Sequence, residues 1–379
     1  MKQCVYADNA ATTKLDIDAF EAMKPYLLED YANPSGAYGF SKKTKRALKE
    51  ARKTIAECIN ADPSNIIFTS GGTESNNHAL RNFTLPTDCR HIITSPIEHH
   101  SVLNVCENCG FEQTIVPVDE HGTVILEEYE KILGKSREVI PSCYSVLVTI
   151  MTANNEIGTI QCIKELARIA HDHGAIFHTD AVQAVGHIPI DVEEMGVDML
   201  SASAHKFNGP KGIGFLYSRN RLLQPYNLGG AQEFGMRAGT ENVPAIVGMA
   251  VALKKNVDEM ERNTLHLKHL TELFLSALRN ANISFLLNGH PIERLPGNIN
   301  ISFKGRSGEG LMHMLDLKGI CISTGSACDS VNQQVSHVIK AINVPIDYRE
   351  GTIRVTFGKD NTEQDAVNVA NTLIKMIGL

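Results

Sequence analysis

Short apolar runs alternate with stretches of helical periodicity over residues 66–203, and this alternation constrains the fold more than any other feature of the sequence. The runs cover residues 66–70, 91–95, 113–118, 145–151, 175–179 and 198–203. Runs of this length between turn-forming residues predict buried strands. A helical stretch precedes the fifth run and ends at Gly174, a typical residue for the end of a helix. The pattern predicts an α/β domain whose mostly parallel sheet has helices on both faces.

The pattern changes beyond Thr240. A helical run from about Pro244 to Asn280 lacks proline and glycine after Gly248, and strands and helices in an α+β order follow it. A chain of 379 residues, 43% of them hydrophobic, can bury one large core and a smaller one. We therefore expect a large α/β domain over residues 15–255. A smaller α+β domain is expected from residues 1–14 and 256–379, with a loop over residues 323–334.

Charge and cysteine content argue against several functional classes. The net charge is -7, and lysine and arginine are scattered instead of clustered, so neither nucleic acid nor a membrane surface is expected as a partner. No apolar run is long enough to cross a membrane, and the start MKQCVYADNAATT does not resemble a signal peptide. Nine cysteines in an uneven spread fit a reducing compartment, so a cytoplasmic location is expected. Cys106 and Cys109 lack a second ligand pair, and no metal site is predicted.

A glycine pair lies in the segment SGGTES, residues 70–75, between an expected strand and an expected helix. Backbone amides near Gly72 and the Thr73 hydroxyl could hold a phosphate at the positive end of that helix. The alternative is a tight turn without a ligand.

An aspartate, Asp180, directly follows the apolar run 175–179, at the strand end where open α/β sheets bind ligands. A carboxylate there can pair with a pyridinium nitrogen and keep it protonated, and Gln183 could bond a phenolic oxygen on the same ring. Asp180 could equally be a helix N-cap.

A lysine, Lys206, follows the run 198–203 within SASAHKFNGPKGIG, and small or polar residues surround it. A lysine at a strand end can lose its proton when it is desolvated and can then attack an aldehyde. Most lysines are solvated surface charges, which is the alternative here.

The stretch STGSACDSVNQQ, residues 323–334, is a poor helix and a poor strand, and we interpret it as a loop. Its cysteine, Cys328, has small and polar neighbours in the sequence, so no large apolar side chains stand beside it for the thiol to pack against. This setting favours a reactive thiol over a buried one.

Eight segments in this order resemble the cysteine desulfurases of the NifS and IscS kind, which are fold-type I pyridoxal-phosphate (PLP) enzymes. The resemblance spans nearly the whole chain. The segments are DNAATT, SGGTES, SPIEHHSV, TANNEIGTIQ, HTDAVQAVG, SASAHKFNGPKGIG, GMRAGTEN and STGSAC. The chain departs from the family pattern at NPSGAYGFS, which lacks a histidine, and at Asp329 beside Cys328.

The resemblance implies a role for each candidate residue. Lys206 and Cys328 would be catalytic together with His99, which would also stack on the cofactor ring. Arg354 would clamp the substrate carboxylate, and Asn155 would also contact the substrate. The implied cofactor contacts are Gly72, Thr73, His99, Asn155, Asp180, Gln183, Ser203, His205 and Lys206, with Thr240 reaching the phosphate across a homodimer interface.

The implied activity is the conversion of L-cysteine to L-alanine, with the sulfur left on Cys328 as a persulfide. The persulfide would then pass to an acceptor protein such as an iron-sulfur scaffold. Two alternatives stay open at this point: a selenocysteine lyase or other PLP lyase, and a non-catalytic scaffold with the same fold.

Overall fold

The computed structural model describes residues 4–83, 90–139, 145–221, 223–325 and 335–378. Its main element is a seven-stranded sheet with the order β2-β8-β7-β6-β5-β3-β4. All neighbouring pairs from β7 to β4 are parallel, and only β8 runs against the others. The strands are β2 Ile66–Thr69, β3 Arg90–Thr94, β4 Glu112–Ile115, β5 Ser145–Thr149, β6 Ile176–Asp180, β7 Met199–Ser203 and β8 Gly214–Ser218. The predicted α/β domain with a mostly parallel sheet is therefore confirmed.

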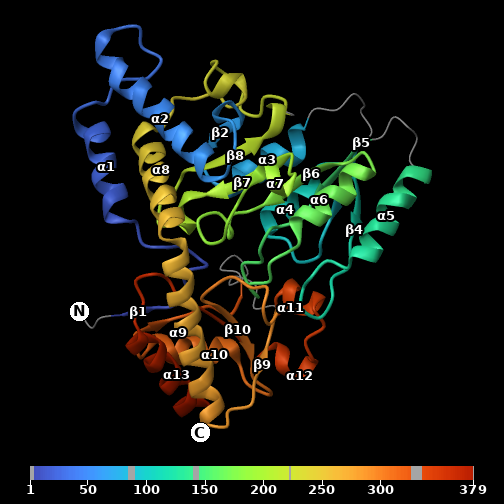
Figure 1. The fold of residues 1–379 in the computed structure, drawn as a ribbon. Helices are drawn as coiled ribbons and strands as arrows, with labels where there is room; N and C mark the ends of the chain where they lie inside the picture. Colours follow the sequence, from blue (N-terminus) through green and yellow to red (C-terminus); the bar gives the residue numbers. More distant parts are fainter. Residues whose placement is uncertain (1–3, 84–89, 140–144, 222, 326–334, 379) are drawn as a thin grey trace.

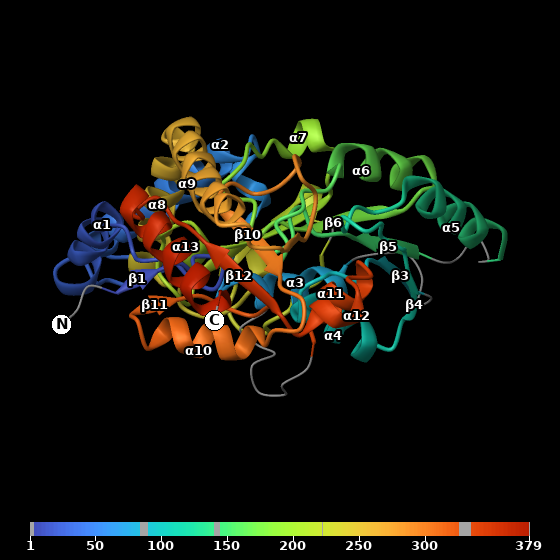
Figure 2. The same cartoon turned by 90° about the horizontal axis from the view of Figure 1, so that it is seen from below.

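Helices cover both faces of this sheet (Figures 1 and 2). They are α1 Ile17–Leu28, α2 Lys42–Cys58, α3 Gly72–Asn82, α4 His100–Asn108, α5 Leu126–Val139, α6 Ile163–Asp172, α7 Val192–Met195 and α8 Val243–Asp258. Alternate strand residues point to opposite faces. Ile67 and Met199 thus pack with α3 and α4, whereas Phe68 and Leu200 pack in the core on the other face.

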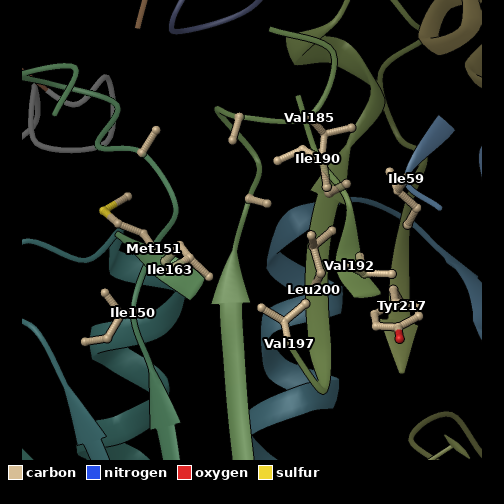
Figure 3. Close-up of a cluster of buried hydrophobic side chains, with 14 of the residues drawn as sticks. Ile59, Ile150, Met151, Ile163, Val185, Ile190, Val192, Val197, Leu200 and Tyr217 are labelled. Atoms are coloured by element: carbon tan, nitrogen blue, oxygen red, sulfur yellow. The ribbon is translucent and has the colours of Figure 1, made fainter. Parts of the chain in front are cut away.

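The larger core fills the second face of the sheet. Figure 3 shows part of it, where Val197 and Leu200 from the β7 region lie near Val192. Helix α6 begins at Ile163 and ends at Asp172, and Gly174 follows with a φ of +70°, as the sequence predicts for a glycine after a helix. Both faces of the sheet are thus buried, which explains the nearly continuous apolar runs.

A second, smaller core lies around a three-stranded antiparallel sheet with the order β12-β10-β9. The N-terminal strand β1 joins this part of the molecule because it pairs with β11. The elements are β1 Val5–Tyr6, β9 Leu286–Leu287, β10 Asn298–Ser302, β11 Ile320–Cys321, β12 Thr352–Thr356, α9 Met260–Asn280, α10 Gly308–Asp316, α11 His337–Ala341, α12 Ile346–Arg349 and α13 Glu363–Ile377. The boundaries of the two expected domains stay a prediction.

The long helical run differs from its expectation in one respect. It is divided into α8 and α9 at Glu259, whose ψ of 5° is not helical. Helix α8 packs on α1 and α2, whereas α9 packs on α13 (Figure 1). Each helix thus packs against its own core, and no glycine or proline stands near Glu259 to mark the break.

No helix in the described part of the chain is long and apolar enough to cross a membrane. Within the same residues, no three His, Cys, Asp or Glu side chains form a group that could hold a metal ion.

Candidate active site

A pocket of about 480 Å³ lies where the C-terminal ends of β6 and β7 meet the N-terminus of α3. Ten of the predicted site residues line it: Gly72, Thr73, His99, Asn155, Asp180, Gln183, Ser203, His205, Lys206 and Arg354. Thr240 is exposed and does not line this pocket. Cys328 lies outside the described residues.

Lys206 ends a short 3-10 turn, η3 (Ala204–Lys206), which begins directly after β7. Its Nζ donates to the carbonyl oxygens of Ala10 at 2.7 Å and Ala11 at 2.8 Å. Gln183 also donates to the Ala10 carbonyl, at 2.9 Å. The segment DNAATT therefore orients both side chains, a role that the sequence did not reveal.

Asp180 is the last residue of β6 and is 4% exposed. Its Oδ1 accepts from the backbone N–H of Val182 at 3.0 Å, and its Oδ2 accepts from Nδ2 of Asn76 at 2.7 Å. The turn contact expected for a capping residue is present, and the carboxylate also lines the pocket. A buried carboxylate is stable as an anion only with donors or a cation beside it, and a pyridinium nitrogen would supply the cation.

The N-terminus of α3 opens toward the pocket, and no side chain among the described residues caps it. Space at this point is narrow: a Cβ on Gly72 would lie 2.6 Å from Cγ2 of Val182, and Gly71 has a φ of +147°. Glycine is required where the backbone approaches this closely. Free amides at a helix N-terminus, with the hydroxyls of Thr73 and Ser203 nearby, suit a phosphate.

Two histidines in the pocket are held uncharged. The pKa of His205 is lowered to about 4 because the ring is buried and because Lys206 and Lys211 lie near it. Burial likewise lowers the pKa of His99; nearby Asp180 opposes this effect, and Lys206 adds to it. Both rings are therefore neutral at pH 7.

Arg354 lies on β12 and is 1% exposed. Its Nη2 pairs with Oδ1 of Asp8 at 2.7 Å, and its Nη1 donates to the Asn155 carbonyl at 3.1 Å. Its Nε is buried and has no partner among the described residues. An unpaired guanidinium N–H beside the pocket suits an incoming carboxylate.

Three residues of this region were missed by the sequence reasoning. Asp8 fixes Arg354, and Asn76 and Ser101 connect Asp180 to His99. Asp8 follows the run VYA and is the first residue of the motif DNAATT. It could have been noticed as a carboxylate at a strand end. Asn76 and Ser101 lie on helices, where a polar residue is usually solvated, and so they carried no signal.

The donor set fits PLP. Asp180 would face the pyridinium nitrogen and Lys206 the aldehyde carbon, whereas the α3 N-terminus with Thr73, Ser203 and His205 would hold the phosphate. The fit rests on the uncapped helix end and on a cradle that a Cβ at Gly72 would fill. Arg354 remains for a substrate carboxylate.

The model of the aminotransferase class-V family matches residues 5–369. The cysteine desulfurase IscS of Dictyoglomus turgidum is 47% identical, and the alignment covers 100% of this chain and 95% of the relative. The IscS of Methanosarcina thermophila is 43% identical over 99% of this chain and 92% of the relative. Among solved structures, a NifS-like protein has a TM-score of 0.90 with 36% identity, covering 99% of this chain and 100% of the other. SspA in complex with cysteine has a TM-score of 0.79 with 35% identity, covering 94% of this chain and 100% of the other.

Proposed function

Since this chain belongs to the class-V aminotransferase family and to its cysteine desulfurases, we propose that it converts L-cysteine to L-alanine with PLP as cofactor. The single observation that carries the proposal is the full-length similarity to IscS proteins at 40–47% identity, together with the neighbour that was solved with cysteine. The pocket supports it, because an amine, a carboxylate and an open helix N-terminus converge there.

Bound PLP supplies an electron sink for the electron pair that is released when an amino acid loses its Cα proton. On this proposal Lys206 holds the cofactor through Nζ, and Asp180 keeps the pyridinium nitrogen protonated. Gln183 faces the phenolic oxygen, while His99 and Asn155 lie beside the ring. The phosphate would be held by Gly72, Thr73, Ser203 and His205 of one subunit and by Thr240 of the partner subunit.

The protein's own groups bind the substrate and move its protons. Arg354 holds the carboxylate. The substrate amine displaces the Nζ of Lys206, and the released Nζ takes the Cα proton as a general base. The Cys328 thiolate attacks the substrate sulfur, so that an S–S bond forms as the C–S bond breaks. One L-cysteine and one thiol thus give one L-alanine and one persulfide, with no external oxidant.

The test is a product analysis with the PLP-loaded protein and L-cysteine. We expect equal amounts of alanine and transferable sulfur, and a Cys328 peptide that is heavier by one sulfur atom. Selenocysteine is assayed in parallel, and a rate far above that with cysteine would favour a selenocysteine lyase. A pure protein that neither binds PLP nor shows its yellow absorbance would instead support the non-catalytic scaffold.

We further propose a homodimer. Exposed apolar side chains support an interface: Ile17, Leu28, Tyr31, Tyr38 and Phe40 lie in or near α1 and α2, and Leu228 and Phe234 lie in the segment that carries Thr240. A subunit interface over these segments would remove the side chains from water, which is favourable for apolar surface. An active monomer in sedimentation would contradict the proposal.

The sulfur acceptor is proposed to be a cytoplasmic protein, such as an iron-sulfur scaffold. The argument is chemical, because a persulfide passes its outer sulfur to another thiol. A pull-down with labelled persulfide identifies the acceptor, and recovery of label only as free sulfide would contradict a protein acceptor.

A further inference from the structure

A continuous hydrogen-bond chain links the carboxylate of Asp180 to the ring of His99. Nδ2 of Asn76 donates to Oδ2 of Asp180 at 2.7 Å and to Oγ of Ser101 at 2.8 Å. Oγ of Ser101 lies 2.8 Å from Nδ1 of His99, and the backbone N–H of Ser101 donates to the same Nδ1 at 3.1 Å. Asn76 is fully buried.

The charge of Asp180 fixes the direction of every bond in this chain. An ionised carboxylate only accepts hydrogen bonds, so the amide nitrogen of Asn76 must face it, not the amide oxygen. That nitrogen has a second hydrogen, and Ser101 Oγ accepts it. The Ser101 hydroxyl hydrogen is then free to point at His99.

Both donors from Ser101 require a lone pair on Nδ1 of His99. A proton on Nδ1 would point at the backbone N–H of Ser101, and two hydrogens would meet. The ring is neutral because its pKa is lowered, chiefly by burial; the charged or titratable groups that face it are Asp180, Lys206, His100 and His337. Its single proton must therefore be on Nε2.

We propose that Asn76 and Ser101 are positioning residues that hold His99 in the neutral tautomer with its proton on Nε2. His99 then offers the pocket a hydrogen-bond donor and no basic nitrogen. The orientation has a cost, since Oδ1 of Asn76 is buried and has no partner among the described residues. The Asn76 amide keeps this orientation although its own carbonyl oxygen finds no partner among the described residues. We attribute the orientation to the Asp180 carboxylate, which needs a donor.

The consequence for the reaction rests on the proposed function. Of the Lys206 amine and the His99 ring, only the amine is then left to take the Cα proton. His99 enters as an acid, able to give the Nε2 proton to a developing negative charge on substrate or cofactor. The tautomer itself does not depend on which reaction the pocket performs.

The experiment measures ring ¹⁵N shifts in the full-length, PLP-loaded protein labelled with ¹⁵N-histidine. His99→Gln identifies the His99 signals by their loss. We expect Nδ1 unprotonated and Nε2 protonated at pH 7 and above. A wild-type signal with the proton on Nδ1, or with both nitrogens protonated at pH 7, would overturn the proposal.

The variants test the chain itself. Asn76→Asp offers at most one hydrogen, which Asp180 takes, so the Ser101 hydroxyl turns to residue 76; Nδ1 of His99 then loses one of its two donors and its ¹⁵N signal should shift. Ser101→Ala should shift the Nδ1 signal, and Ser101→Thr, which keeps the hydroxyl, should restore it. Asn108→Ala on the exposed end of α4 is the matched control and should change nothing.

Unchanged His99 shifts in both Asn76→Asp and Ser101→Ala refute the roles of these residues, even if the wild-type tautomer is the expected one. If one variant fails to fold, the other decides. Loss of the proposed activity is scored separately, from alanine formation, and a protein without desulfurase activity can still show the expected tautomer.

Discussion

Replacement of Arg354 by lysine tests the proposed contact to the substrate carboxylate. The guanidinium reaches Asp8 and the Asn155 carbonyl at once, and its Nε has no partner in the described part of the chain. A lysine carries the same charge but offers a single ammonium, which cannot reproduce this fork. The variant should therefore keep Asp8 paired and lose the contact to the substrate.

The size of the effect follows from one lost hydrogen bond between charged groups. Such a bond contributes about 1.5–3 kcal/mol, which corresponds to a fall in kcat/KM of about 10- to 150-fold. The contact exists in the bound substrate as well as in the transition state, so most of the change should appear in KM.

The assay is alanine formation over a range of L-cysteine concentrations. Arg306→Lys, an exposed arginine, is the control and should keep wild-type kinetics. Binding of 2-aminoethanethiol, which lacks the carboxylate, is followed by cofactor absorbance and should be equal in wild type and Arg354→Lys. An unchanged KM for cysteine, or an equal loss of affinity for the carboxylate-free amine, would refute the reasoning.

Three further changes give distinct outcomes. Cys328→Ala should stay yellow and still change its absorbance with L-cysteine, because other residues contact the cofactor, but it should release almost no sulfide. Turnover at the rate of the parent protein would show that Cys328 has no catalytic role. Lys206→Ala should lose the normal absorbance in a spectrum of the purified protein, because its Nζ is the amine proposed to hold the cofactor; an unaltered spectrum contradicts that role. Burial raises the pKa of Glu98 to about 8. The stability that this carboxyl contributes is fully present below the unfolded pKa near 4.3. It falls as the pH rises from there through 8, by up to about 1.4 kcal/mol per pH unit, because the unfolded chain loses the proton first. Glu98→Gln should remove this slope in urea unfolding between pH 5 and 8, and equal slopes in the two proteins contradict the assignment.

The fold followed closely from sequence periodicity, because the strands are buried on both faces and the pattern is therefore strong. All six runs of the first domain became strands within a few residues of their expected ends. The ends were less certain: the run 113–118 stops pairing at Ile115, two residues before Pro117, which cannot donate to a sheet. The break at Glu259 was invisible because it follows from the packing of α8 and α9 on different cores.

For the site, sequence by itself determined the chemically distinctive residues. Lys206, Asp180 and Gly72 stand at strand ends or helix starts, where chain topology alone brings them to one edge of the sheet. Their order along the chain, together with the quoted motifs, was enough to indicate the family.

Only the tertiary structure decided how these residues are held. Asp8 meets Arg354 across 346 residues, and Asn76 meets Asp180 across 104. No local pattern encodes such contacts, because they depend on how β12 and the segment after β1, or α3 and β6, approach each other after folding. The tautomer of His99 follows in turn from the charge of Asp180, which reaches it through side chains on two different helices.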